Sequence, residues 1–162
     1  MPLFYLDTFA LLKRYKTEKG TDVIDALFSG RKEDEVFVTS HFTAVEVESV
    51  AARSLKGRLL NKRAHGALLR LFAEDLEIEI ISLPVSTTLL REAAEVARRR
   101  STRAGDALHL ATAIRVKDAA PSKSIFVTSD AELVNASVAE GFTVLNPEHE
   151  DALSLLLAFR KA

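Results

Sequence analysis

Two kinds of apolar pattern alternate along this chain. Short runs of consecutive apolar residues, such as Leu3–Leu6, are separated by longer stretches in which apolar residues recur every three or four positions. The short runs are typical of strands buried on both faces, and the longer stretches are typical of amphipathic helices. Strands are therefore predicted over 3–6, 36–39, 78–81, 125–127 and 142–145. Helices are predicted between and after them, over 8–20, 21–29, 40–57, 64–75, 86–100, 103–113, 131–140 and 151–159, with a loop at 119–122.

The alternation of strands and helices predicts an α/β fold. Strands that are joined through helices run parallel, and the connecting helices cover both faces of the sheet. The expected architecture is a three-layer α/β/α sandwich around a central, mostly parallel five-stranded sheet. No internal repeat, low-complexity tract or linker interrupts the 162 residues. The whole chain, 1–162, is therefore predicted to be a single domain.

Composition narrows the chemistry that this domain can carry. Cysteine is absent, which excludes disulfides and thiolate metal sites. The formal net charge is −1 at pH 7, so any contact with nucleic acid has to come from a local basic patch. No apolar run approaches the roughly 18 residues that cross a bilayer, and the N-terminus does not resemble a signal peptide. A cytoplasmic protein without a membrane partner is expected.

Four carboxylates lie where a ligand would bind in such a fold. Asp7 and Asp130 each follow a predicted strand, and Glu46 and Asp106 each lie in the first turn of a predicted helix. Because the carboxyl ends of parallel strands share one edge of a sheet, the four side chains can converge there. Clustered carboxylates without cysteine or a convincing set of histidines suit Mg²⁺ or Mn²⁺. Such an ion can activate water and neutralise charge on a phosphoryl oxygen.

Three of the four carboxylates also have a purely structural interpretation. Asp7 and Asp106 could cap helices by accepting backbone N–H bonds, with Thr8 competing for the first cap. Thr43 and Glu46 have the spacing of a capping box, which would occupy the Glu46 carboxylate at the start of its own helix.

Two further choices depend on local pattern. Ser129 and Glu132 form a capping box that is predicted to begin the helix after the fourth strand and to leave Asp130 free. Helical periodicity alone does not choose between Glu46 and Glu48 as the acid that faces the sheet edge.

Several motifs occur along the chain in a characteristic order. They are Leu6-Asp7-Thr8, Ser40-x-x-Thr43-x-x-Glu46, Arg103-Ala104-Gly105-Asp106-Ala107-Leu108-His109-Leu110-Ala111, Thr128-Ser129-Asp130 and Gly141-Phe142-x-Val144-x-Asn146-Pro147. In this order and spacing they resemble a PIN domain, and more narrowly the VapC-type toxins of prokaryotic toxin–antitoxin pairs. The resemblance covers nearly the whole chain and implies a metal-dependent ribonuclease with a small α/β/α sandwich.

The resemblance also implies roles for individual residues. Four carboxylates would be catalytic and ligate Mg²⁺ or Mn²⁺, namely Asp7, Glu46, Asp106 and Asp130. This choice favours Glu46 over Glu48. The hydroxyls of Thr8 and Thr128 would orient those carboxylates or a metal-bound water. His109 is not a ligand in the family pattern, so it is interpreted as a helix-packing residue.

Basic residues close to these motifs are candidates for RNA phosphate contacts. They are Arg53, Lys56, Arg98, Arg99, Arg100 and Arg103. Arg53 shares a helical stripe with Glu46, and Arg103 closely precedes Asp106. On charge alone, however, a basic run is more often a solvated face.

The resemblance further implies a homodimer and, for a toxin, a small antitoxin protein as partner. The predicted helix over 64–75 carries Leu68, Leu69, Leu71 and Phe72, and the preceding helix is apolar nearly all round. Helices at one edge of a five-stranded sheet would keep an exposed apolar stripe, which usually marks an interface.

Two other enzyme or signalling classes fit the sequence less well than a ribonuclease. An aspartate-nucleophile phosphatase needs a second acid where this chain has Phe9, and a phospho-accepting receiver domain needs an acidic pair that Tyr5-Leu6-Asp7 lacks. Two alternatives stay open: a housekeeping PIN-domain nuclease that processes RNA, and a non-catalytic PIN-like module that binds RNA or protein.

Overall fold

The computed structural model describes residues 2–119 and 123–161, so most of the expected loop at 119–122 lies outside the described part. The apolar runs form one sheet in which every neighbouring pair of strands is parallel. The strands lie in the order β3-β2-β1-β4-β5. Their bounds are β1 Leu3–Leu6, β2 Val36–Ser40, β3 Ile80–Leu83, β4 Ser124–Val127 and β5 Thr143–Leu145. The predicted sheet is confirmed, and it is parallel throughout.

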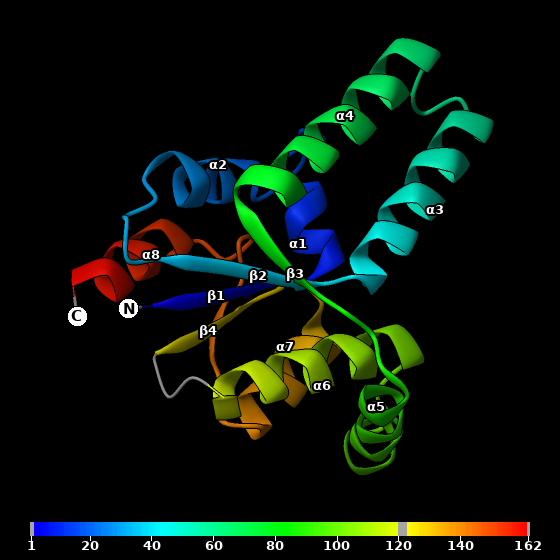
Figure 1. The fold of residues 1–162 in the computed structure, drawn as a ribbon. Helices are drawn as coiled ribbons and strands as arrows, with labels where there is room; N and C mark the ends of the chain where they lie inside the picture. Colours follow the sequence, from blue (N-terminus) through cyan, green and yellow to red (C-terminus); the bar gives the residue numbers. More distant parts are fainter. Residues whose placement is uncertain (1, 120–122, 162) are drawn as a thin grey trace.

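Helices cover both faces of this sheet (Figure 1). Their bounds are α1 Thr8–Leu12, α2 Thr21–Ser29, α3 Phe42–Lys56, α4 Lys62–Ile78, α5 Thr87–Arg100, α6 Ala104–Ala119, α7 Ala131–Ala139 and α8 Ala152–Lys161. Phe4 and Leu6 of β1 enter a core with α1–α4 and α8, while Leu3 and Tyr5 enter a core with α5–α7. The three-layer α/β/α sandwich is therefore confirmed. Among the described residues, no helix is long and apolar enough to cross a membrane.

The first helix is shorter than its sequence pattern predicts. α1 ends at Leu12, whereas the pattern extends to Gly20. The carbonyl oxygen of Lys13, which would accept a bond within a longer helix, accepts one from the Thr21 hydroxyl at 2.8 Å instead. The chain after α1 consequently folds back to begin α2.

The third strand begins at Ile80 rather than at residue 78. α4 continues through Ile78, and the Glu79 N–H still donates to the Asp75 carbonyl at 2.8 Å, so the helical hydrogen bonding extends into the expected strand. The apolar residues of this segment fit a helix or a strand. Ile78 belongs to the helix, and the strand begins two residues later, at Ile80.

α3 and α4 form a hairpin that projects away from the sheet (Figure 1). α3 begins beside the carboxyl end of β2 and ends at Lys56. The first turn of α3 is therefore anchored at the sheet edge, while its last turn lies far out on the projecting arm.

Candidate active site

The strand order creates a switch point between β1 and β4. The chain moves outward from β1 through β2 to β3, and then returns to pair β4 with the free side of β1. Connections leave the carboxyl ends of β1 and β4 in opposite directions, which opens a crevice where ligands commonly bind in such sheets. Asp7 immediately follows β1, and Asp130 follows β4 after a short turn.

Asp7 is buried and holds two hydrogen bonds. Its Oδ1 accepts from the Ala10 N–H at 2.6 Å as the N-cap of α1, and its Oδ2 accepts from the Thr128 hydroxyl at 2.6 Å. Its side chain is 2% exposed, and burial raises its pKa to about 6 despite these hydrogen bonds. The cap interpretation is therefore correct for one oxygen, while the other is held by the turn after β4.

Glu46 is not held by the predicted capping box. α3 begins at Phe42, so Thr43 already lies inside the helix, and its hydroxyl contacts that of Thr39 at 2.7 Å. The Glu46 carboxylate instead accepts a hydrogen bond from the Thr8 hydroxyl. Tertiary contact with the start of α1 replaces the local cap and aims Glu46 at the crevice.

His109 takes part in the same network, although its sequence position suggested packing alone. Its Nε2 lies 2.7 Å from Glu46 Oε2, and its Nδ1 lies 3.0 Å from the Tyr5 hydroxyl. Because a carboxylate only accepts, Nε2 carries the hydrogen in the contact with Glu46. Burial raises the pKa of Glu46, but the contacts with His109 and Thr8 outweigh burial and hold that pKa below its ordinary value.

Asp130, rather than Ser129, caps α7. Its Oδ1 accepts from the Leu133 N–H at 3.0 Å, so the prediction of a Ser129 capping box that leaves Asp130 free is wrong. The Thr128 hydroxyl accepts from the Asp130 N–H at 3.2 Å and fixes the turn that presents this carboxylate. The other oxygen of Asp130 remains turned toward the crevice.

A single guanidinium bridges the last two carboxylates. Arg103 Nε donates to Asp106 Oδ2 at 2.9 Å, and an Arg103 terminal nitrogen donates to Asp130 Oδ2 at 2.6 Å. Asp106 lies in the first turn of α6 with its carboxylate engaged by this side chain. Burial raises the pKa of Asp106, and the charge of Asp130 raises it further against the opposing charge of Arg103. The two carboxylates are thus close enough to share one cation.

Gly105 allows α6 to approach α3 at the site. A Cβ at this position would lie 3.1 Å from Glu46 Oε1 and 3.4 Å from the Phe42 ring. The glycine that precedes Asp106 in the sequence motif therefore has a packing reason, since a larger residue would push Glu46 and Asp106 apart.

The four acids meet at one edge but form a loose cluster. The charge of Asp106 raises the pKa of Asp7, and the charge of Asp130 raises the pKa of Asp106, while Glu46 contacts His109. Among the described residues, no group of three or more His, Cys, Asp or Glu side chains is arranged to hold one metal ion. Mg²⁺ commonly uses one or two carboxylates and keeps several waters, so oxygen donors in this arrangement are compatible with it.

Two of the candidate RNA contacts are engaged elsewhere. Arg99 and Arg100, at the end of α5, donate to the Glu140 carboxylate at 2.8 and 2.7 Å. These contacts lower the pKa of Glu140 to about 2. Both side chains thus tie α5 to the end of α7.

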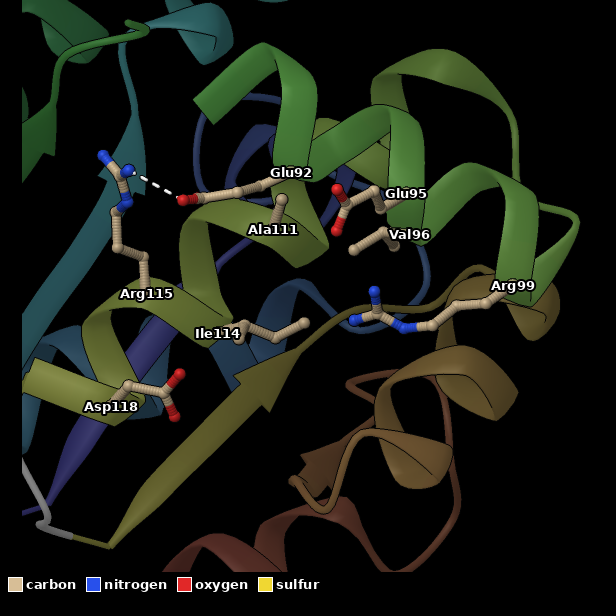
Figure 2. Close-up of a pocket in the computed structure, with 8 residues that line it drawn as sticks. All are labelled: Glu92, Glu95, Val96, Arg99, Ala111, Ile114, Arg115 and Asp118. Carbon is tan, nitrogen blue, oxygen red and sulfur yellow. Dashed lines mark hydrogen bonds and ion pairs between the residues drawn. The ribbon is translucent and has the colours of Figure 1, made fainter. Parts of the chain in front are cut away.

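Arg99 also borders a pocket between α5 and α6 (Figure 2). This pocket is lined by Glu92 and Glu95 as well, and Glu92 pairs with Arg115 at 2.9 Å. Asp118 is a third carboxylate of its lining, and none of the four candidate acids borders it, so this pocket is separate from the acidic crevice.

The remaining candidates have different positions. Arg53 and Lys56 are exposed in the last turns of α3, on the projecting arm, and Arg98 is exposed on α5. Glu46 begins the same stripe of α3 close to the sheet, so Arg53 lies further out on the side of α3 that carries this acid.

A parallel α/β/α domain with an acidic crevice at its switch point belongs to the class of folds that place a ligand at the carboxyl edge of the sheet. The chain belongs to the PIN domain family, whose model matches residues 4–139.

Individual relatives are distant. The chain is 29% identical over 118 residues to ribonuclease VapC45 of Mycobacterium tuberculosis CDC 1551, which covers 73% of this chain and 79% of VapC45. Ribonuclease VapC49 of M. tuberculosis H37Rv matches to the same extent. The fold is similar to a chain in the crystal structure of FitAcB from Neisseria gonorrhoeae, with a TM-score of 0.59 and 21% identity over 90% of this chain and 99% of that chain.

Proposed function

We propose that this protein is a metal-dependent ribonuclease that hydrolyses RNA phosphodiester bonds in the cytoplasm, as the toxin of a type II toxin–antitoxin pair. The observation that carries the proposal is the meeting of four carboxylates at the switch point of a PIN-family sheet, which are Asp7, Glu46, Asp106 and Asp130. The similarity to two ribonucleases named VapC supports the choice of RNA.

The chemistry of the donor set favours Mg²⁺, the ion that PIN nucleases typically use, or Mn²⁺. Asp106 and Asp130, which already share one guanidinium, would ligate the ion directly, and Asp7 and Glu46 would contact its bound waters, because no three acids of the described residues are arranged around one ion. The bound ion would activate a water and neutralise charge on the cleaved phosphate. A guanidinium already stands between Asp106 and Asp130, which supports the view that this position attracts a cation.

The chain's own residues prepare the carboxylates for this role. The Thr128 hydroxyl fixes the rotamer of Asp7, and the Thr8 hydroxyl fixes that of Glu46. His109 donates to Glu46 and keeps it ionised, so this acid can accept a proton or bind a cation at neutral pH. Positioned carboxylates cost no reorganisation when charge develops on the substrate.

RNA phosphates would run outward from the acids along the surface of α3. Arg53 and Lys56 are the best placed of the basic residues for this, with Arg98 and Arg103 flanking the other side. Arg99 and Arg100 would first have to leave Glu140. If Arg53 contacts a phosphate, Arg53→Ala flattens the dependence of log affinity on log salt by about 0.7 for single strands.

Assembly is part of the same proposal. Leu71 and Ile78 on α4 are 43% and 74% exposed, Val45 on α3 is 62% exposed, and Ile81 on the edge strand β3 is 55% exposed. These apolar side chains support a homodimer through this edge, or a helix of a small antitoxin laid against it. Light scattering at tens of micromolar tests the homodimer. A monomer at this concentration would rule out a stable homodimer and favour the antitoxin as the partner of this surface.

The test is cleavage of single-stranded RNA by the purified protein with Mg²⁺ or Mn²⁺. We expect EDTA to abolish cleavage, and Asp106→Asn or Asp130→Asn to reduce it by orders of magnitude while the variants stay folded. Asp25→Asn, an exposed carboxylate of α2, is the matched control and should cleave normally. Undiminished cleavage in EDTA would refute metal dependence.

Two outcomes would favour the alternative functions. RNA binding without any cleavage or divalent requirement would indicate a PIN-like binding module. Cleavage by a protein whose neighbouring reading frame encodes no small antitoxin would indicate a housekeeping RNA-processing nuclease.

A further inference from the structure

An aromatic ring stands at the mouth of the acidic crevice. Phe9 follows Asp7 and Thr8 in α1, and it is 50% exposed although its neighbours Thr8 and Ala10 are almost completely buried. Neither of the two core clusters found among the described residues includes Phe9. Its ring is therefore not needed to fill the interior, and exposing it to water has a cost in free energy.

Phe9 lines a cleft of about 540 Å³ whose lining includes one of the four acids, Asp130. Asp130 and Arg103 form the wall that this cleft shares with the carboxylates, and Lys13 and Lys19 lie on the side of α1. The volume is within the range of sites that hold small organic groups. A group seated on Phe9 would thus be adjacent to whatever the carboxylates act on.

The charges of the cleft differ in how far they are already neutralised. Lys13 is buried, and its ammonium pairs with Glu18 at 3.3 Å and with Glu148 at 2.6 Å. Lys19 has no ion pair of this length in the described structure and is exposed on the rim, although its charge still helps to lower the pKa of Glu148. An apolar aromatic face beside an exposed cation matches the two parts of a nucleotide, because a base stacks on a ring while its phosphate seeks positive charge.

We propose that Phe9 is a stacking platform for one base of single-stranded RNA next to the cleaved bond, and that Lys19 contacts a phosphate of the same strand. This proposal rests on the ribonuclease function proposed above and adds the subsite that positions its substrate. Every base has an aromatic face, so the subsite accepts all four bases, with purines held more firmly because they offer more area. The cleft thereby selects unpaired RNA, since a base in a duplex is not free to stack on a protein ring.

The first experiment compares Phe9 variants by fluorescence anisotropy with labelled oligoadenylate in EDTA and low salt, where the strand stays intact. Phe9→Ala is expected to weaken binding by about five-fold to 150-fold, the measured range for loss of one stacked base. Phe9→Trp should restore binding, and Phe9→Leu should restore little of it. Val138→Ala is the matched control, because Val138 is a 58% exposed apolar side chain on α7 outside the cleft.

A strand that lacks bases identifies stacking as the cause. The wild type and Phe9→Ala should bind an oligomer of abasic sugar phosphates equally weakly. An equal loss of affinity by Phe9→Ala for adenylate and abasic strands would overturn the proposal, because the ring would then act through the protein rather than on a base.

The phosphate contact has its own matched pair of variants. Lys19→Ala is expected to lower the slope of log affinity against log salt by about 0.7, whereas Lys16→Ala, an exposed lysine on the same segment, leaves it unchanged. Equal slopes for both variants would overturn the role of Lys19.

Failure of this subsite is distinguishable from failure of the nuclease. If the wild type cleaves RNA while Phe9→Ala binds adenylate as tightly as the wild type, the stacking platform is refuted and the ribonuclease stands. If the wild type neither binds nor cleaves RNA under any metal condition, the ribonuclease is refuted and the subsite with it.

Discussion

The substitution Asp7→Asn should make the metal-free protein more stable at neutral pH. The Asp7 carboxyl is buried, and burial raises its pKa from 3.8 to about 6. The folded protein therefore holds a proton that the unfolded chain has already released between these two values. Because the folded state binds more protons there, the free energy of unfolding falls as the pH rises through this window. Asparagine has the shape of the protonated side chain and avoids this loss.

The size of the effect follows from the two pKa values. By linkage, the wild-type carboxylate is expected to cost about 1 kcal/mol at pH 4.5 and about 3 kcal/mol at pH 7.5 relative to a neutral side chain. The asparagine carbonyl can still accept from the Ala10 N–H, and the Thr128 hydroxyl can turn to accept from the amide. The stability advantage of the variant should therefore grow by about 2 kcal/mol between these pH values.

Urea unfolding in EDTA at both pH values measures this growth. Asp25→Asn, which replaces an exposed carboxylate of α2, is the control and should show little change with pH relative to the wild type. Addition of Mg²⁺ should stabilise the wild type more than Asp7→Asn, because an ion neutralises the same charge that the substitution removes. A constant difference between variant and wild type at the two pH values would refute the reasoning, whatever its sign.

Three other perturbations test neighbouring parts of the structure. Arg103→Ala frees the two carboxylates that this side chain bridges, so calorimetry should show that Mg²⁺ binds several-fold more tightly. Unchanged or weaker binding would show that the guanidinium does not compete with the ion. Glu35→Ala leaves the buried guanidinium of Arg160 without its partner and should lower the free energy of unfolding by about 3–5 kcal/mol, whereas a loss below about 1 kcal/mol would mean that water reaches Arg160. Gly20→Ala places a Cβ 2.8 Å from the Pro147 carbonyl oxygen at a φ of 87°, and should lower the melting temperature by several degrees without changing RNA affinity. An unchanged melting temperature would mean that the Pro147 segment gives way.

The sequence predicted the strands, their parallel sheet and the two layers of helices, because runs such as Leu3–Leu6 depend on burial alone. It failed where two local patterns competed. Ser129 and Asp130 are both good N-cap residues, and the position of the turn after β4, fixed through Thr128, selects Asp130. Nothing in the local sequence records the path of that turn.

The sequence did not predict the contact of His109 with Glu46, for a related reason. Its partners are Glu46, Thr8 and Tyr5, which lie far away in the sequence and meet only when α3 and α6 pack on β1. The position of His109, one helical turn after Asp106, does not indicate these partners. The motif around Asp106 carried the signal for the site, while the contacts that orient each carboxylate come from tertiary structure.

The order β3-β2-β1-β4-β5 has a consequence for biosynthesis. Of these five strands, β1 is made first and becomes the middle of the sheet. It can pair with β2 early, but its other side stays open until residues 124–127 have been made. Asp7 and Asp130 therefore come together only when most of the chain has emerged and the long-range β1–β4 pairing has closed. A nascent or truncated chain without β4 lacks the acidic crevice, so any activity of that crevice begins only after β4 has paired with β1. The same open strand edge makes unfinished chains prone to aggregation, and the pairing that removes this edge also completes the crevice.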